Sequence, residues 1–395
     1  MDAELDALVI GGGIQGLLAL EALQDRGYTA ALATDGDLGE GQTAHSHGFL
    51  NTGFGMMGSA LADASRDVVQ PYLRDHGVEP TGGWRVVPPP GVPTPAPAAP
   101  LDAGFDESFG ARAVASPDRN FPKRRLIEAI AGARRDSVVR GRAALGVRAG
   151  GVRTVSIQTA DGDEVSLGAR AVVVAAGCGT KRMLEDLVGR TAQTSEIKHR
   201  RVHMICVRAP RRALPATSVM VMPLGLMLAA HDDGAAITWY VTPMEFGGPS
   251  FDDVPRDATS VEDPEMVARG FHSLLRLYPG LRDAADVRVG SYAGYRQDVG
   301  DMPAHALCEP MAGAEDVVVA LPSGLVTPWL NATRIVELVA DRVTPGKRHP
   351  QLSVAANAIG ISRPVEDRPD FVWYPFDDFA HRVREGQPAS SSSAT

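Results

Sequence analysis

Apolar and polar positions follow two different periods along the chain, and these periods predict strands and helices. Residues 5–10 are apolar except for Asp6 and are followed by glycine, which is typical of a buried parallel strand. Apolar residues then recur at helical spacing from Ile14, with Gly27 as a stop signal, and residues 28–33 predict the next strand. Strand, glycine turn, helix and strand within about 30 residues form a βαβ unit.

Further along, the two ends of the chain alternate strands with helices, while the middle is mainly strand-like. Residues 152–159 and 164–167 flank the turn Asp161-Gly162 and predict a hairpin, and residues 171–176 predict a separate buried strand. Other strands are predicted over residues 218–222, 236–241, 287–292 and 317–321, and helices over residues 121–134, 264–278 and 331–343. This order predicts an α/β fold, in which a Rossmann-like nucleotide-binding domain carries an inserted, mainly antiparallel β-sheet substrate domain.

Three charged or unusual segments are expected at the surface. The basic residues of the helix predicted over 121–134, among them Lys123 and Arg124, suit a solvated face better than a ligand site. The proline-rich stretch 88–100 predicts a surface loop. Residues 371–376 are aromatic enough to dock on the body of the protein.

Composition argues against several classes of function. The formal net charge of −9 makes a nucleic-acid partner unexpected, and no apolar run approaches the roughly 20 residues of a membrane span. The N-terminus is acidic where a secretory signal is basic, so a cytoplasmic protein is expected. Cys178, Cys206 and Cys308 lie far apart without a CxxC pair, which predicts neither a disulfide framework nor a metal site.

The glycine loop after the first strand is the strongest single motif. Gly11-x-Gly13-x-x-Gly16 follows a strand and opens a helix, where glycines permit a tight turn and close approach of the backbone to a pyrophosphate. Its other members, Gly12, Ile14 and Gln15, belong to the same candidate site. The alternative is a tight structural turn. The loop alone does not separate FAD from NAD, and Asp35 at the end of the second strand is the candidate acid for the ribose hydroxyls.

The sequence after Asp35, GDLGEGQTAHSHGFLNTG, resembles the superfamily of FAD proteins that includes D-amino-acid oxidase, glycine oxidase and sarcosine dehydrogenase. The resemblance implies that Thr43, Ala44 and Gly48 lie along the flavin. It also places the family's ribose-binding glutamate on Thr34, one residue before Asp35.

Later segments match the same superfamily in the same order. Residues 171–177 look like its later FAD-domain strand, which implies that Ala176 and Gly177 contact the cofactor. Residues 293–296 and 301–303 resemble its GlR…D..P motif. The turn before the closing helix implies contacts to the flavin pyrimidine edge from the residues Gly324, Leu325, Val326 and Thr327.

The resemblance also suggests a division of the chain. The FAD-binding domain would take residues 1–58, 115–190 and 293–345, the substrate domain residues 59–114 and 191–292, and a C-terminal extension residues 346–386. Residues 387–395 are expected to form a disordered tail.

Three residues are candidates for chemistry, each with a structural alternative. His45 has the spacing of the histidine that bonds covalently to flavin in the sarcosine dehydrogenase branch, or it packs beside the ring. His47 is a candidate catalytic base with a pKa near the working pH, or it is hydrogen-bonded to loop backbone. Arg296 matches an arginine that binds a substrate carboxylate, or it forms an ion pair with Asp298 or Asp301.

Together these features predict an FAD-dependent oxidoreductase that oxidises a C–N bond of a small-molecule amine or amino acid. A substrate carbon roughly 3–3.5 Å from flavin N5 would pass it a hydride, and oxygen would then accept the electrons. The alternatives are oxidation of a 2-hydroxy acid, a flavin-binding protein without catalysis and an NAD-only dehydrogenase. The proline-rich loop and the aromatic tail hint at a specialised substrate in a biosynthetic pathway. Tyr240, Tyr292 and Tyr295 would line the pocket or belong to the core.

Overall fold

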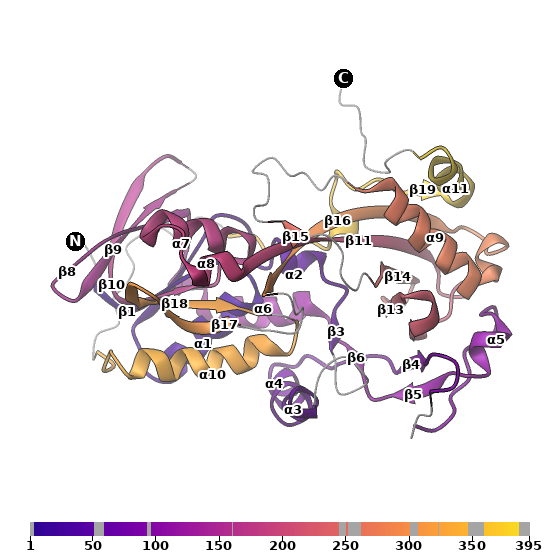
Figure 1. Ribbon diagram of the computed structural model, residues 1–395, viewed down its shortest axis with the longest axis horizontal. Helices are drawn as coiled ribbons and strands as arrows, with labels where there is room; N and C mark the ends of the chain where they lie inside the picture. The colour runs from indigo at the N-terminus through magenta and orange to yellow at the C-terminus, as the bar shows by residue number, and fades with distance from the viewer. Residues whose placement is uncertain are drawn as a thin grey trace.

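The computed structural model describes residues 4–50, 59–92, 96–159, 161–244, 250–251, 262–300, 307–322, 324–346 and 359–386. Two β-sheets lie one after the other along the length of the molecule, with β1 and β10 in one and β11–β14 in the other (Figure 1). The fold is α/β with a second, largely antiparallel sheet, as the sequence predicts.

Among the described residues, eight strands form the first sheet, with β17-β18-β10-β1-β2-β7 in spatial order and the hairpin β8–β9 attached to β10. Their bounds are β1 Glu4–Ile10, β2 Ala30–Thr34, β7 Val138–Arg140, β8 Arg142–Ala149, β9 Val152–Gln158, β10 Glu164–Val174, β17 Leu307–Met311 and β18 Ala314–Leu321. Strand β1 pairs in parallel with β2 and β10, and β10 pairs in parallel with β18. The carboxyl ends of these strands therefore share one edge, where open α/β sheets bind ligands.

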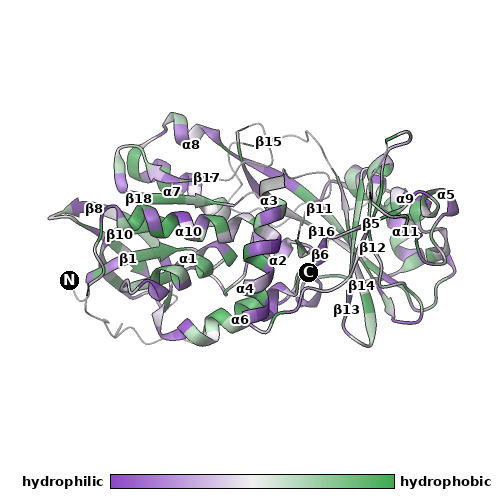
Figure 2. Ribbon diagram, turned by 90° about the horizontal axis from the view of Figure 1, so that it is seen from below, coloured by the Kyte–Doolittle hydropathy of each residue, from purple (hydrophilic) through white to green (hydrophobic). Residues whose placement is uncertain are grey.

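Helices α1 (Ile14–Asp25), α6 (Lys123–Arg134) and α10 (Thr327–Ala340) cover one face of this sheet and share its main apolar core. The buried Gln15 side chain joins two of them, because it accepts a hydrogen bond from Asn331 Nδ2 at 3.0 Å and its amide lies 3.4 Å from the Pro328 carbonyl. Helix α7 (Thr180–Val188) packs into a second core cluster through Leu184. In Figure 2 the strands β1 and β10 at the centre of this sheet are largely green, whereas α10 carries both green and purple residues.

Two predicted elements need correction in this sheet. The hairpin around Asp161-Gly162 is confirmed, but its second strand continues without a break into the buried strand, so that residues 164–174 form the single strand β10. The twist of one long strand lets its exposed start pair with β9 and its buried end pair with β1. Helix α10 begins at Thr327, before the predicted Asn331, because Pro328 is well placed in a first helical turn.

In the described part of the chain, nine strands form the second sheet, in the order β19-β16-β11-β14-β13-β12-β4-β5, with β15 beside β11. Their bounds are β4 Trp84–Val87, β5 Val114–Ser116, β11 Ile197–Pro210, β12 Ser218–Val221, β13 Leu226–Asp232, β14 Ala236–Pro243, β15 Ser250–Phe251, β16 Arg288–Val299 and β19 Tyr374–Pro375. All these pairs are antiparallel except β4 with β12. Helix α9 (Pro264–Leu277), close to its predicted bounds, covers one face through a second apolar core.

The domain boundaries themselves stay a prediction. Residues 293–299, which the sequence assigns to the FAD-binding domain, continue strand β16 of the second sheet. Strands β11 and β16 are long enough to run from the second sheet toward the first (Figure 1). These two strands of the second sheet place side chains in the cavity beside the first sheet.

The segment 359–386 docks on the body of the protein, as expected for its aromatic residues. Phe371 and Trp373 pack against a buried cluster, and β19 adds to the edge of β16. Helix α11 (Phe376–Arg384) buries Phe379 against Phe271 of α9, with ring centroids 5.1 Å apart. Of the proline-rich stretch, residues 89–92 are exposed, as predicted for a surface loop. The predicted disordered tail 387–395 lies outside the described residues.

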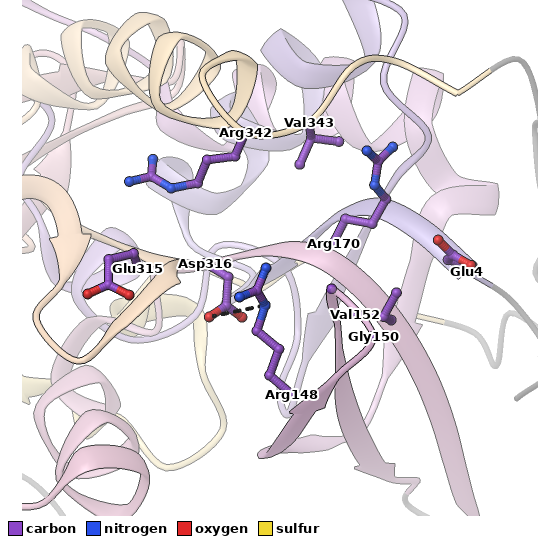
Figure 3. Close-up of a pocket in the computed structure, with 10 residues that line it drawn as sticks. Glu4, Arg148, Gly150, Val152, Arg170, Glu315, Asp316, Arg342 and Val343 are labelled. Carbon is purple, nitrogen blue, oxygen red and sulfur yellow. Dashed lines mark ion pairs between the residues drawn. The ribbon is translucent and has the colours of Figure 1, made fainter.

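A cavity of about 460 Å³ lies at the amino ends of β1 and β18 and is rich in paired charges (Figure 3). Buried Asp316 accepts hydrogen bonds from Arg153 at 2.6 and 2.9 Å and lies 3.9 Å from Arg148. Arg170 lies 3.3 Å from the Asp6 carboxylate. These pairs stabilise the fold, and the cavity lies at the edge opposite to the carboxyl ends of the parallel strands.

No helix within the described ranges is long and apolar enough to cross a membrane. The three cysteines, all in described parts of the chain, are free thiols, and no group of His, Cys, Asp or Glu among the described residues is arranged to hold a metal ion.

Candidate active site

A cavity of about 1100 Å³ runs from the carboxyl ends of β1, β2 and β10 to the second sheet. Ligand pockets commonly measure about 300–1,000 Å³, so this one has room for more than a small ligand. One end is lined by the glycine loop and by residues that follow β2. The other end is lined by residues of β11, β13, β14 and β16 and by Arg368 and Asp370.

The glycine loop forms a cradle that side chains would fill. Gly11 has a φ of +122°, and a Cβ there would lie 2.3 Å from the Ala175 carbonyl oxygen. A Cβ on Gly16 would lie 1.8 Å from the Gly11 oxygen, which explains why Gly16 is needed although it does not line the cavity. Thr43 Oγ1 accepts a hydrogen bond from Ile14 N at 3.2 Å, and the start of α1 is directed at the cavity. This geometry suits a pyrophosphate.

The residues after β2 supply acids at the same end of the cavity. Thr34 is buried, and its hydroxyl donates to the Gly36 carbonyl at 3.2 Å, whereas Asp35 is exposed and lines the cavity. Sequence reasoning overlooked Glu40, which also lines the cavity and accepts a hydrogen bond from Asp37 N at 3.0 Å. Either Asp35 or Glu40 offers a carboxylate for ribose hydroxyls, and the assignment stays a prediction.

The structure contradicts the prediction that Lys123 belongs to a solvated face. Its Nζ donates to the carbonyl oxygens of Thr43 at 2.9 Å and Ala44 at 3.2 Å, and also to that of Ser46. The side chain leaves the first turn of α6 and reaches back to the loop, while Arg124 and Arg125 of the same turn are exposed as expected. Burial lowers the pKa of Lys123 to about 8. Lys123 therefore holds the backbone of the loop in which His45 and His47 lie.

His45 lies in the cavity wall between this loop and β16. Its Nδ1 is 2.6 Å from the Gly41 carbonyl oxygen, which places the proton on Nδ1 and leaves Nε2 with its lone pair. The ring packs against Gly294 and meets the Tyr292 ring edge to face at 5.5 Å. Burial lowers the His45 pKa below its ordinary value. A neutral ring with an unprotonated Nε2 suits both the packing interpretation and a covalent bond.

His47 also lines the cavity, but its environment differs from that of a base. Phe49 N donates to His47 Nδ1 at 3.1 Å, and the His47 carbonyl lies 2.8 Å from His231 Nε2. Burial, followed by the charges of Lys123, His231 and Arg296, lowers the His47 pKa to about 3. The expected pKa near the working pH does not hold, and the hydrogen bond from loop backbone favours the structural interpretation.

Buried neutral histidines predict lability in acid. Burial lowers the pKa of His47 to about 3 and those of His231 and His203 to about 4, below the ordinary 6.5. Between pH 6.5 and the lowered pKa values, the histidines bind protons in the unfolded chain but not in the folded protein. The free energy of unfolding should therefore fall as pH drops from 6.5 toward 4. The loss is up to about 1.4 kcal/mol for each histidine and each unit by which its pKa is lowered. Urea unfolding followed at several pH values measures this slope. His231→Gln should make it shallower, and an unchanged slope would contradict the assignment.

Four further predicted residues play supporting parts outside the cavity lining. Ala44 packs against a buried cluster, and Thr327 Oγ1 donates to the Gly324 carbonyl at 3.1 Å, at the start of α10. Gly48 has a φ of +76°, and a Cβ there would lie 2.8 Å from the Phe121 carbonyl oxygen. Position 48 therefore requires glycine because a side chain would collide with the protein's own backbone. Gly16, the fourth, packs on Gly11 as described above.

The remaining predicted cofactor residues also line the cavity. Gly12 and Gly13 do so between β1 and α1, Ala176 and Gly177 after β10, and Gly324, Leu325 and Val326 before α10. Backbone amides at the start of α10 provide a positive partial charge there. Ser323 and residues 301–303 of the predicted motifs lie outside the described residues.

Arg296 lines the second-sheet end of the cavity and is already in an ion pair. Its Nε lies 2.9 Å from Asp298 Oδ1, and Nη2 of Arg200, its partner across β11 and β16, lies 2.5 Å from the other oxygen. The alternative in which Arg296 pairs with Asp298 is therefore observed. Asp301, the other suggested partner, is not among the described residues.

Several residues of this end were missed by sequence reasoning. They are Cys178, Arg200, Arg201, Met204, Met227, Met244, Arg368 and Asp370. Cys178 directly follows Gly177, so its position was a usable signal, and burial raises its pKa to about 12. Of the three tyrosines considered, Tyr292 and Tyr295 line the cavity, while the Tyr240 hydroxyl donates to buried Glu366.

A glycine cradle at the carboxyl edge of a parallel sheet, facing an antiparallel sheet across one cavity, defines a dinucleotide-binding protein. The chain belongs to the DAO family of FAD-dependent oxidoreductases, whose family model matches residues 6–327. The protein is accordingly an FAD-dependent oxidoreductase, which excludes the NAD-only alternative. No protein of curated function matches the sequence.

Solved structures share the fold. An FAD-dependent oxidoreductase from Pseudomonas aeruginosa is 21% identical, with a TM-score of 0.66 over 92% of this chain and 98% of that one. Glycine oxidase from Geobacillus kaustophilus is 19% identical (TM-score 0.65; 86% and 96%). An L-amino acid deaminase from Proteus vulgaris, with its specific insertion deleted, is 14% identical (TM-score 0.64; 89% and 93%). The family implies FAD, and the glycine cradle, the acids after β2 and the long cavity fit that cofactor.

Proposed function

We propose that this oxidoreductase oxidises a C–N bond of an amino acid or a related amine that carries an acid group, with oxygen as the electron acceptor. The observation that carries the proposal is the charge at the second-sheet end of the cavity. Arg200, Arg201, Arg296 and Arg368 line it beside the acid Asp370, and Asp298 pairs with two of these arginines. A surplus of guanidinium groups favours an anionic substrate. Glycine oxidase and L-amino acid deaminase share the fold.

Bound FAD supplies the hydride acceptor for such a reaction. The protein's part is to bind the acid group through arginine and to exclude water with the apolar side chains of Met204, Met227 and Tyr292. The positive end of α10 stabilises negative charge where it faces the cavity. Since a pKa of about 3 makes His47 a weak base, the substrate amine loses its proton to solvent, and kcat/KM should rise with pH toward the pKa of the amine.

A steady-state screen separates this proposal from its alternatives. Amino acids, N-alkyl amino acids and the matching 2-hydroxy acids would each be supplied in air, with hydrogen peroxide and the imine-derived product measured. Turnover confined to the amines is expected. Turnover confined to 2-hydroxy acids would replace the proposal by oxidation of an alcohol carbon, and no turnover with either class would favour a flavin-binding protein without catalysis.

Covalent attachment of FAD through His45 is a second part of the proposal, supported by the unprotonated Nε2 of that ring. Precipitation of the purified protein with acid should leave the yellow colour in the pellet. His45→Asn, which keeps a hydrogen-bond donor but has no ring nucleophile, should release the colour into the supernatant. A colourless wild-type pellet would show that the cofactor is held without a covalent bond.

A further inference from the structure

The segment 359–376 lies beyond the part of the chain that matches the family model, yet it forms part of the cavity wall. At its start, Leu38 N donates to the Gly360 carbonyl and Ser362 N donates to the Leu38 carbonyl, each at 2.9 Å. This short ladder fixes the segment beside the acids that follow β2. At its end, β19 pairs with β16 of the second sheet. The segment therefore spans the two ends of the cofactor cavity.

Its middle is anchored by a buried acid. Glu366 is 7% exposed, and its carboxylate accepts a hydrogen bond from the Tyr240 hydroxyl of β14. Trp373 Nε1 donates to the Glu366 carbonyl at 3.1 Å, and Val365 packs in the cluster of Met204 and Cys206. Two residues beyond this anchor stands Arg368, so its backbone has a defined position against the second sheet.

Arg368 differs from the neighbouring arginines in its partners. Arg200 and Arg296 share the carboxylate of Asp298. Arg368 Nη2 donates to Ser362 Oγ at 3.1 Å within its own segment, and no carboxylate of the described residues forms an ion pair with it. It lines the cavity together with His45 and Tyr292, and its charge adds to the burial that lowers the His45 pKa. A guanidinium that lines a ligand-sized cavity suits a bidentate carboxylate.

We infer that Arg368 is the residue that binds the acid group of the substrate, and that it thereby determines specificity for carboxylate-bearing amines. The inference rests on the proposed function and names the recognition residue of that same site. Under this inference, the role of Arg296 is structural and consists of its ion pair with Asp298. The C-terminal segment then acts as a substrate-binding element beyond the residues that the family model matches.

Binding of benzoate, compared with its neutral isostere benzamide, tests the inference without any turnover. Each is titrated into the oxidised holoenzyme, and the change in the visible flavin spectrum gives Kd. Arg368→Gln should weaken benzoate binding by ~10–100-fold and leave benzamide unchanged, because a charge-assisted pair is lost. Arg363→Gln, an exposed arginine of the same segment, is the matched control and should leave both Kd values unchanged.

Two further variants separate recognition from support of the fold. Ser362→Ala removes the hydrogen bond to Arg368 but keeps the guanidinium, so benzoate affinity should stay within about threefold. Arg296→Gln should weaken benzoate binding less than Arg368→Gln does. The inference is overturned if Arg368→Gln leaves benzoate affinity intact, if Ser362→Ala reproduces its loss, if Arg296→Gln has the larger effect, or if the wild type does not prefer benzoate to benzamide. Failure of the proposed function would appear separately, as absence of turnover with amines.

Discussion

Gly16→Ala is expected to weaken FAD binding by ~100-fold. The added Cβ would lie 1.8 Å from the Gly11 carbonyl oxygen, so helix α1 and the glycine loop must move apart. Gly11 is itself confined, because its own Cβ position lies 2.3 Å from the Ala175 carbonyl, and the loop cannot yield on that side. Overpacking of this kind costs about 3 kcal/mol or more, which is ~100-fold in affinity. Flavin content per chain after purification and reconstitution measures the loss.

Helix α6 offers the matched control for this substitution. Gly132 also lies within a helix, but a Cβ there meets no atom within 4 Å. Gly132→Ala should keep full flavin content and stabilise the protein by about 0.5–1 kcal/mol, since alanine favours helix. A Gly16→Ala protein with normal flavin content would show that the loop does not form the cradle described here.

Lys123→Met is expected to reduce kcat by ~100-fold. Methionine has a similar length but no donors, so the carbonyls of Thr43, Ala44 and Ser46 lose the ammonium group that holds them. Displacement of a positioning loop by about 1 Å can cost that factor. The free energy of unfolding should also fall by about 2–4 kcal/mol, because partly buried carbonyls lose charge-assisted hydrogen bonds. Rapid-reaction kinetics and urea unfolding measure the two effects.

A substitution of the neighbouring Arg124 is the control that distinguishes this role of Lys123 from a general effect of removing a charge from α6. It is exposed and pairs with Glu128 one turn along at 2.8 Å. Arg124→Met should change kcat by less than about twofold and stability by less than about 0.5 kcal/mol. If Lys123→Met behaves like Arg124→Met, the loop is held by its other contacts and Lys123 is not a positioning residue.

The parts of the fold that sequence could predict are those encoded locally. The strand before Gly11, the helix after it and the hairpin at Asp161-Gly162 each follow from period and turn chemistry over a few residues. The glycines of the cradle are predicted by the same local motif. Gly16 faces a steric limit within its own βαβ unit, where a Cβ would meet the Gly11 oxygen, whereas Gly11 is confined by the distant Ala175.

The rest of the site depends on contacts between distant segments. The sequence predicts Lys123 at the surface because it stands in the same basic run as Arg124, and only the position of the loop 41–48 shows its acceptors. The pKa of His47 is set by burial against groups from other elements, which no local pattern indicates. Arg368 reaches the cavity because Glu366 is bound to Tyr240, 126 positions earlier in the chain.

Anaerobic mixing of the purified holoenzyme with amino acids tests the central claim most directly. We expect the visible flavin absorbance of the wild type to bleach with a carboxylate-bearing amine and to return when oxygen is admitted, with hydrogen peroxide and an imine-derived product formed in equal amounts. The matching 2-hydroxy acids should leave the spectrum oxidised. Bleaching by the hydroxy acids alone, or a flavin that no amine reduces, would contradict the account.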